Sequence, residues 1–241
     1  MTITLNDLGQ PVGALLRDWQ PPPIPARETM SGVFCRIEPL DAGRHGKSLF
    51  EANALDREGR NWTYFSYGPF ASFESYSAWL TESASGRDPL FFAIVDRCTE
   101  RAVGVASYMR IDPGSGSIEV GHLNFSPLLQ RKPAATDAMY LMMKNAFALG
   151  YRRYEWKANA LNAPSRRAAQ RFGFSFEGVF RQATVSKGRN RDTAWYSALD
   201  QEWPALDNAY SRWLDPSNFD QNGQQKMALS ALTAPVLKQR G

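Results

Sequence analysis

One turn constrains the fold of this chain more than any other segment. The run Asp112-Pro113-Gly114-Ser115-Gly116 separates two apolar segments, 103–111 and 118–125. Proline presets the backbone angle of a turn and glycine accepts positive φ, so this run reverses the chain sharply. A third apolar segment, 90–95, precedes the pair across a polar turn. We therefore expect an antiparallel meander of three strands.

The spacing of apolar residues predicts which segments on either side of this meander are helices and which are strands. Before it we expect a strand at 33–37, a helix at 40–54 and a second helix capped by Ser72. After it we expect a helix at 133–149, a strand at 153–158, a helix at 165–172, a hairpin of 174–185 with 193–199, and a helix at 202–214. This order predicts an α+β (mixed α/β) fold, in which a mixed sheet carries helices on both faces.

The two ends of the chain differ from its centre. Residues 1–32 are expected to form an arm, because the proline-rich run 19–25 favours extended polyproline geometry and Trp19 and Ile24 could pin it to the surface. Residues 33–203 are expected to form the main domain. Residues 204–241 supply a helix and a Gln- and Ser-rich tail, which either stays mobile or docks on another subunit.

Composition excludes several classes of protein. There is no apolar run of about 18 residues, and the N-terminus lacks the pattern of a secretory signal, so we expect no membrane span and a cytoplasmic location. The chain has two cysteines, Cys35 and Cys98, and two histidines, His45 and His122. Neither a disulfide framework nor a metal site is expected from so few residues.

The positive charge is concentrated in one segment. The chain carries a net charge of +4, but residues 151–191 contain ten Lys or Arg and only two Glu. Such a segment favours an anionic partner, which could be a nucleic acid or a phosphate-bearing cofactor. A solvated basic face remains the simpler alternative.

The junction between the strand ending at Phe125 and the helix starting at Pro133 is a candidate phosphate site. A helix N-terminus offers free backbone amides and partial positive charge, both of which bind phosphate. Arg131 and Lys132 add charge, and Thr136 adds a hydroxyl. The small side chains of Ala134 and Ala135 allow an anion to approach the backbone.

A second segment completes a recognisable pattern. Asn162-Ala163-Pro164-Ser165 follows a strand, and Gly173-Phe174-Ser175-Phe176-Glu177-Gly178 follows the next helix. With Gln130-Arg131-Lys132-Pro133-Ala134-Ala135 at the preceding helix, the region from Gly32 to Trp203 resembles the GCN5-related N-acetyltransferase (GNAT) superfamily. Within it, the chain resembles the RimJ/RimL-like branch.

This resemblance implies a mostly antiparallel sheet with splayed central strands and acetyl-CoA as the acetyl donor. The pyrophosphate would lie at the amides from Gln130 to Thr136, and the pantetheine along Leu123–Phe125. The implied cofactor-binding residues are Leu123, Asn124, Phe125, Gln130, Arg131, Lys132, Ala134, Ala135, Thr136, Asn159, Asn162 and Ser165. The excess positive charge of residues 151–191 would then serve to bind the phosphates of acetyl-CoA. Pro133 replaces the central glycine of the family signature and removes one amide donor.

The implied reaction is attack of a neutral amine on a thioester, which benefits from a general base. Ser165 matches the serine that the branch uses as acid for the leaving thiolate. The carboxylate that the branch places after the Glu-Gly segment is replaced by Thr184. Glu119 and His122 are therefore the candidate bases. The structural alternatives are that Glu119 pairs with an arginine and that His122 only packs.

The acceptor side is less defined. The aromatic segment 61–70 offers Tyr64 and Tyr67 as acceptor-binding residues, whereas Trp62 and Phe65 are expected to pack in the core. The leading hypothesis is an N-acetyltransferase that uses no metal and acts on a peptide N-terminus or a small amine, with a homodimer left open. The alternatives are a catalytically silent acyl-CoA-binding module and, less favoured, a nucleic-acid-binding protein.

Overall fold

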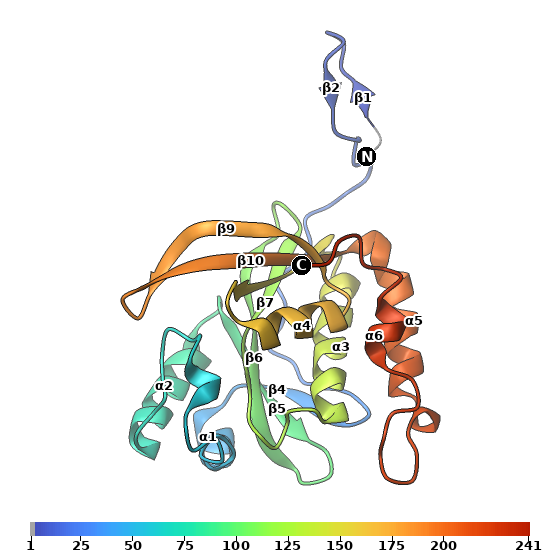
Figure 1. Ribbon diagram of the computed structural model, residues 1–241. Coiled ribbons are helices and arrows are strands. Elements are labelled where there is room, and N and C mark those ends of the chain that lie inside the picture. The colour runs from blue at the N-terminus through green and yellow to red at the C-terminus, as the bar shows by residue number, and fades with distance from the viewer. Residues whose placement is uncertain (1–2) are drawn as a thin grey trace.

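The computed structural model of the chain describes residues 3–241 (Figure 1). Its strands are β1 (Thr4–Leu5), β2 (Pro11–Val12), β3 (Met30–Ser31), β4 (Cys35–Pro39), β5 (Leu90–Asp96), β6 (Arg101–Asp112), β7 (Ser117–Phe125), β8 (Arg153–Asn159), β9 (Ser175–Ser186) and β10 (Arg189–Leu199). Its α-helices are α1 (Ala42–Asn53), α2 (Phe73–Ser85), α3 (Pro133–Ala148), α4 (Ala163–Arg171), α5 (Trp203–Leu214) and α6 (Leu229–Thr233).

The main sheet has eight strands in the order β3-β4-β5-β6-β7-β8-β10-β9. Every neighbouring pair is antiparallel except β7 and β8, which are parallel. The expected meander is present as β5, β6 and β7, and the tight reversal ends at Gly116, whose φ of 65° is in the left-handed region. The predicted α+β fold with a mostly antiparallel sheet is thereby confirmed.

The two parallel strands separate along their length. The pairing of β7 with β8 runs from Ser117 with Arg153 to Val120 with Trp156 and goes no further, although both strands continue. Between β6 and β7 the register shifts so that His122 and Leu123 lie opposite a single residue of β6. This β-bulge turns β7 away from β8. The sheet therefore splays at its centre, as the resemblance implied.

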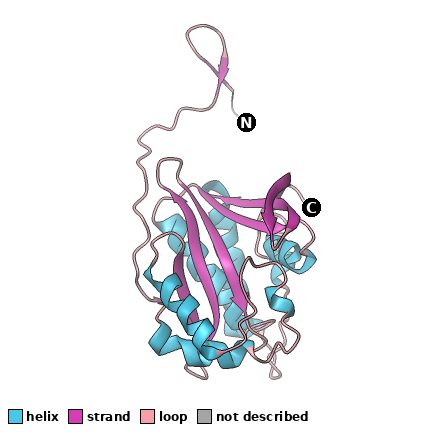
Figure 2. Ribbon diagram, turned by 90° about the vertical axis from the view of Figure 1, so that its left-hand side faces the viewer, coloured by secondary structure: helices cyan, strands magenta, loops and turns pink. Residues whose placement is uncertain are grey.

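Helices cover both faces of the sheet, which explains why the central strands are apolar throughout (Figure 2). Along β5, alternate residues point to opposite faces. Phe91, Ala93 and Val95 pack in a core with α1 and α2. Phe92 and Ile94 pack in a larger core with α3 and α5. Met139, Met142 and Met143 of α3 are fully buried there, in keeping with a purely structural role.

Two expected boundaries were wrong for local reasons. The helix expected at 165–172 begins at Ala163, because the side chain of Asn162 caps it and Pro164 fits its first turn. The hairpin expected across 187–190 has a shorter turn. Lys187 and Gly188 both have positive φ and form a two-residue reversal, so β10 begins at Arg189.

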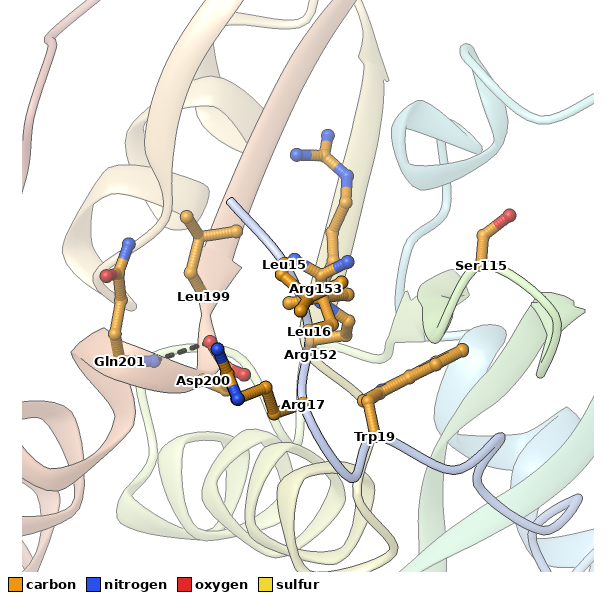
Figure 3. Close-up of a pocket in the computed structure, with 10 residues that line it drawn as sticks. All are labelled: Leu15, Leu16, Arg17, Trp19, Ser115, Arg152, Arg153, Leu199, Asp200 and Gln201. Atoms are coloured by element: carbon orange, nitrogen blue, oxygen red, sulfur yellow. Dashed lines mark hydrogen bonds between the residues drawn. The ribbon is translucent and has the colours of Figure 1, made fainter. Parts of the chain in front are cut away.

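The N-terminal arm runs along the body and ends in the β1–β2 hairpin, which projects away from it (Figure 1). Pro22 and Pro25 are buried against the body, whereas Ile24 is 60% exposed and does not pin the arm as expected. Trp19 lies over the β6–β7 turn at Gly116. A cavity of about 700 Å³ is lined on the arm by Leu15, Leu16, Arg17 and Trp19 and on the body by residues that include Arg152, Arg153 and Asp200 (Figure 3).

The C-terminal tail does not follow either expectation. It packs on its own chain, with Leu229 of α6 fully buried in the larger core. The amide of Phe176 donates a 3.0 Å hydrogen bond to the carbonyl of Gln239, which fastens the chain end beside β9. Among residues 3–241, no helix combines the length and apolar character required to cross a bilayer.

Candidate functional site

A cavity of about 1450 Å³ opens where β7 and β8 diverge. Its walls come from both strands, the start of α3, helix α4, the loop before α2 and the β9–β10 hairpin. Fifteen of the sixteen residues that the sequence analysis assigned to the site line it: Tyr64, Tyr67, Glu119, His122, Leu123, Asn124, Phe125, Gln130, Arg131, Lys132, Ala135, Thr136, Asn159, Asn162 and Ser165. Ala134 does not line it and is buried in the larger core.

The start of α3 forms one end of the cavity. Lys132 is the N-cap, Pro133 is the first helical residue, and the structure shows no side-chain cap at this described helix end. The side-chain amide of Gln130 donates to Oδ1 of Asn61 (2.9 Å) and to the carbonyl of Phe125 (2.8 Å). Gln130 therefore fixes the loop. The uncapped positive end of α3, with exposed Arg131 and Lys132, favours an anion.

Arg171 of α4 places a further positive charge behind this helix end. Its Nη1 donates to Oγ1 of Thr136 at 3.1 Å. The guanidinium also lies over the rings of Phe172 and Trp213, with its carbon 5.2 and 5.3 Å from their centroids. Burial lowers the pKa of Arg171, which nevertheless stays charged at neutral pH.

Ser165 lies on the first turn of α4, at the diverging strands. Oδ1 of Asn162 accepts a hydrogen bond from the Ser165 amide at 3.2 Å and so orients the turn. The indole Nε1 of Trp156, on β8, donates to Oγ of Ser165 at 3.1 Å. Since the serine oxygen acts as acceptor in this bond, its own proton is free to be donated into the cavity.

Glu119 is a buried carboxylate held by two cations. Its side chain is 3% exposed, and it binds Nη1 of Arg110 at 2.8 Å and Nζ of Lys157 at 2.9 Å. The expected pairing with an arginine is therefore confirmed, and Lys157 joins it. Burial raises the pKa of Glu119, and the charges of Lys157 and Arg110 oppose that rise.

His122 sits in the β7 bulge with φ of 50°. Its Nδ1 is hydrogen-bonded to the hydroxyl of Tyr67 at 2.9 Å, and the two rings stack with centroids 5.6 Å apart. Burial, together with the charge of Arg110, lowers the pKa of His122 to about 4. The imidazole is therefore neutral at physiological pH, but it is a much weaker base than its ordinary pKa suggested.

The β9–β10 hairpin reaches across the part of the cavity lined by Tyr67, Glu119 and His122, which we call the acceptor end, and is fastened to the loop before α2. Nζ of Lys187, at the hairpin tip, donates to the carbonyls of Trp62 (3.0 Å) and Gly68 (3.2 Å). Trp62 is 4% exposed and packs as expected. The hydroxyl of Tyr64 donates to the carbonyl of Leu161 at 3.2 Å, so this loop also contacts the start of α4.

The side-chain amide of Asn124 is the clearest sign that the cavity binds a ligand, because the protein itself leaves its hydrogen-bonding groups unsatisfied. Asn124 lines the cavity and is 3% exposed, and neither Oδ1 nor Nδ2 of its side chain has a hydrogen-bond partner among residues 3–241. A buried amide without partners costs free energy unless a bound molecule supplies them. Asn124 thus points to a polar ligand at this part of the cavity.

Six basic residues that line the cavity were not singled out from the sequence: Arg60, Arg110, Lys157, Arg167, Arg171 and Arg191. Four of them belong to the basic segment 151–191, whose charge was assigned as a whole to the phosphates. Arg171 lies at the α3 end, where it binds Thr136. Lys157 and Arg191 lie beside Glu119, at the acceptor end. The excess positive charge of residues 151–191 did indicate the site, but the place of each basic side chain in the cavity could be known only from the fold.

Comparison with known proteins gives one consistent result. The family described as "Acetyltransferase (GNAT) domain" matches residues 38–175. The chain is 48% identical to a GCN5-related N-acetyltransferase from Brucella melitensis, with a TM-score of 0.89, and the match covers 91% of this chain and all of the other. It is 41% identical to a probable acetyltransferase (GNAT family) from Chromobacterium violaceum, with a TM-score of 0.76, over 81% and 98% of the two chains.

A curated relative is more distant. The chain is 27% identical over 113 residues to the uncharacterized N-acetyltransferase p20 of Bacillus licheniformis. That match covers 46% of this chain and 63% of the relative, which is less than two thirds of the relative's length. All three relatives carry an acetyltransferase description, and none of these descriptions names an acceptor.

Proposed function

Because the chain belongs to the GNAT acetyltransferase family, we propose that it transfers the acetyl group of acetyl-CoA to a primary amine. One observation carries this proposal. The strands β7 and β8 part beyond Val120 and Trp156, and the cavity between them connects the positive end of α3 to the hydroxyl of Ser165. This arrangement can hold a long anionic thioester with its reactive end between the strands.

The residues at the α3 end fit the phosphates of the donor. The uncapped helix end, Arg131 and Lys132 supply amides and charge, and the small Ala135 lets a phosphate approach. The pantetheine would run along β7, where the unpartnered amide of Asn124 can bond its polar groups. Pro133 lacks one amide donor, so the side chains beside it have a larger share in binding.

The splayed strand also supports the chemistry of acetyl transfer. The β7 backbone beyond Val120 is not paired to β8, so its amides at 123–125 are candidates to stabilise the oxyanion. Ser165 would donate its free proton to the departing thiolate. These groups are positioned by the sheet and by α4 before the substrate arrives.

Of the two candidate bases, we favour Glu119. Its pKa is raised toward neutrality by burial, and a base is most effective when its pKa lies near the working pH. His122, at a pKa of about 4, is better suited to fix Tyr67 at the acceptor end. A water molecule bound to Glu119 would carry the proton away from the amine.

The silent acyl-CoA-binding module remains the second candidate, favoured by Thr184 in place of a carboxylate and by Pro133 in place of glycine. The presence of Glu119 in the cavity weakens it, because a buried carboxylate supplies the base that Thr184 does not. Binding of acetyl-CoA without turnover of any amine would establish this alternative.

The finer assignments remain proposals. We retain the RimJ/RimL-like branch, a cytoplasmic location, an arm at 1–32, an acyltransferase domain at 33–203 and a C-terminal segment at 204–241. A homodimer would use the exposed apolar side chains of the arm, which include Ile3, Leu5, Leu8 and Leu15. Sedimentation of the full chain and of a variant lacking residues 1–16 would detect it.

The proposed function is tested by incubating the purified protein with acetyl-CoA and a mixed set of amines and peptides. Release of coenzyme A and a gain of one acetyl group by an amine, read by mass spectrometry, would support it. Turnover in the absence of any amine would instead indicate a thioesterase. Failure to bind acetyl-CoA at all would overturn the assignment of the cavity.

A further inference from the structure

The acceptor end of the cavity contains three basic side chains that have different partners. Arg110 and Lys157 both bind Glu119, and Lys157 also binds Glu155 at 2.7 Å. Arg191, on β10, lines the same cavity, but no carboxylate of the described residues lies within ion-pair distance of it. Arg191 therefore adds positive charge that the protein itself leaves without a direct partner.

The residues around Arg191 explain why it has no partner. Its cross-strand neighbour on β9 is Thr184, which carries no charge. The adjacent Asp192 is engaged elsewhere, because its Oδ1 accepts hydrogen bonds from the Gln182 amide (2.7 Å) and from Nδ2 of Asn190 (3.0 Å). The nearby Glu119 is already bound by Arg110 and Lys157, so no carboxylate pairs directly with Arg191 among the described residues.

Arg191 is half-buried, and its Nε is fully buried with no hydrogen-bond partner among residues 3–241. Burial and the nearby charge of Arg110 lower the pKa of Arg191, whereas the charge of Glu119 raises it. A buried guanidinium nitrogen without a partner is unfavourable, and a guanidinium normally pairs with a carboxylate or a phosphate. Because Arg191 lines the cavity, an anion bound there could pair with it.

The β9–β10 hairpin limits the size of the molecule that carries the anionic group. Lys187 fastens the hairpin tip to the loop carbonyls of Trp62 and Gly68, so β9 and β10 cross the acceptor end. Aromatic side chains of Tyr67, Phe180 and Trp195 form the remaining wall. A short acceptor fits beneath such a cover more readily than an extended peptide does.

We infer that the acceptor is a small primary amine that carries its own anionic group, a carboxylate or a phosphate, and that Arg191 binds this group. The inference rests on the proposed function for the identity of the amine as acceptor. The anion would pair with the Arg191 guanidinium while the amine faces Glu119 and the thioester. A peptide N-terminus lacks the α-carboxylate and would leave Arg191 unpaired.

The test compares amines that differ only in charge. Free α-amino acids and their carboxamides form one pair of probes, and phosphoethanolamine and ethanolamine form the other. The amine of a carboxamide is less basic and more often neutral, so reactivity alone favours the uncharged probe. A preference for the anionic probe therefore reports binding of the anion, and the two pairs distinguish a carboxylate from a phosphate.

The variant Arg191→Gln should lower the ratio of kcat/KM for the anionic and uncharged probes about 10- to 100-fold, the effect of one charge-assisted hydrogen bond. Arg191→Lys should lower this ratio less, because lysine keeps the positive charge. Arg189→Gln is the control, because Arg189 lies on the same strand, is exposed and does not line the cavity. It should leave the ratio unchanged.

Calorimetry separates this inference from the proposed function. The anionic probe should bind the complex of the protein with coenzyme A, and Arg191→Gln should weaken that binding whether or not turnover occurs. Acetylation of amines with no preference for the anionic probe, or with a ratio unaffected by Arg191→Gln, would overturn the inference and leave the proposed function standing. Anion binding that depends on Arg191 without any acetyl transfer would overturn the proposed function alone.

Discussion

The indole Nε1 of Trp156 donates a hydrogen bond to Oγ of Ser165 at 3.1 Å, and this bond joins strand β8 to helix α4 at the wall of the cavity. Trp156 is the last β8 residue paired with β7, and Ser165 lies on the first turn of α4. The bond fixes the serine oxygen as an acceptor. It thereby directs the serine proton toward the place where the thiolate would leave.

Replacing Ser165 by alanine should lower kcat about 10- to 100-fold, the contribution of a modest general acid, while the affinity for acetyl-CoA changes little. Trp156→Phe is the companion variant, because it keeps the hydroxyl and removes only the group that orients it. It should have a smaller effect on kcat. Steady-state kinetics together with calorimetry of coenzyme A binding would show this, and unchanged kcat in Ser165→Ala would remove Ser165 from the mechanism.

Replacing Glu119 by glutamine should lower kcat and abolish the loss of activity that accompanies protonation of this carboxylate. Its pKa is raised by burial, so the wild-type acidic limb should lie above the ordinary carboxyl range. The pH profile of kcat at saturating substrate measures it. Glu177→Gln is the control, since Glu177 pairs with Arg153 outside the cavity. An acidic limb that persists in Glu119→Gln would contradict its role as base.

His122 should make folding stability depend on pH in a defined window. Its pKa is about 4 in the folded chain and 6.5 ordinarily, so between these values the unfolded state binds more protons. Stability should fall as the pH drops from 6.5 to 4, by at most about 3 kcal/mol. Urea unfolding at several pH values should show a shallower decline in His122→Asn. Equal slopes in the two proteins would show that His122 is not buried in its neutral form.

A carboxylate placed at the start of α3 should compete with the phosphates of the donor. Ala135→Glu is expected to weaken acetyl-CoA binding about tenfold or more, because the new charge occupies the positive helix end. Lys132→Gln, at an exposed position, should produce a smaller loss. Circular dichroism would establish that both variants fold. Unchanged affinity in Ala135→Glu would place the phosphates elsewhere.

Releasing the tip of the β9–β10 hairpin should weaken binding of the acceptor and leave binding of the acetyl donor unchanged. Lys187→Met removes the hydrogen bonds to the carbonyls of Trp62 and Gly68, so we expect the acceptor KM to rise about three- to tenfold with acetyl-CoA affinity unchanged. Hydrogen exchange at the tip of β9 and β10 should become faster. The control is Lys144→Met, an exposed lysine of α3 outside the cavity. An effect on both substrates alike would argue against a specific role at the acceptor end.

Local signals in the sequence predicted most of the fold. The turn ending at Gly116 predicted the meander, and Ser72 caps α2 as its side chain suggested. The same signals could not place the tail, because docking of Leu229 depends on a surface formed by distant segments. The short turn at Lys187 was missed because a lysine rarely adopts positive φ.

The candidate site was predicted only in part, because local signals reveal motifs but not contacts between distant segments. Residues within short continuous motifs, Arg131 and Lys132 in one and Ser165 in another, could be assigned from the sequence and do line the cavity. The position of Arg191 could not be predicted, because it depends on the strand order that places β10 beside β8. The shifted pKa of His122 also arises from neighbours far along the chain, among them Arg110.

The most direct test of this account is a crystal structure of the protein with coenzyme A. We expect the pyrophosphate at the start of α3, close to Lys132 and Ala135, the pantetheine along β7 near Asn124, and the sulfur within hydrogen-bond reach of Ser165. Coenzyme A bound outside the space between β7 and β8, or absent at saturating concentration, would contradict the account.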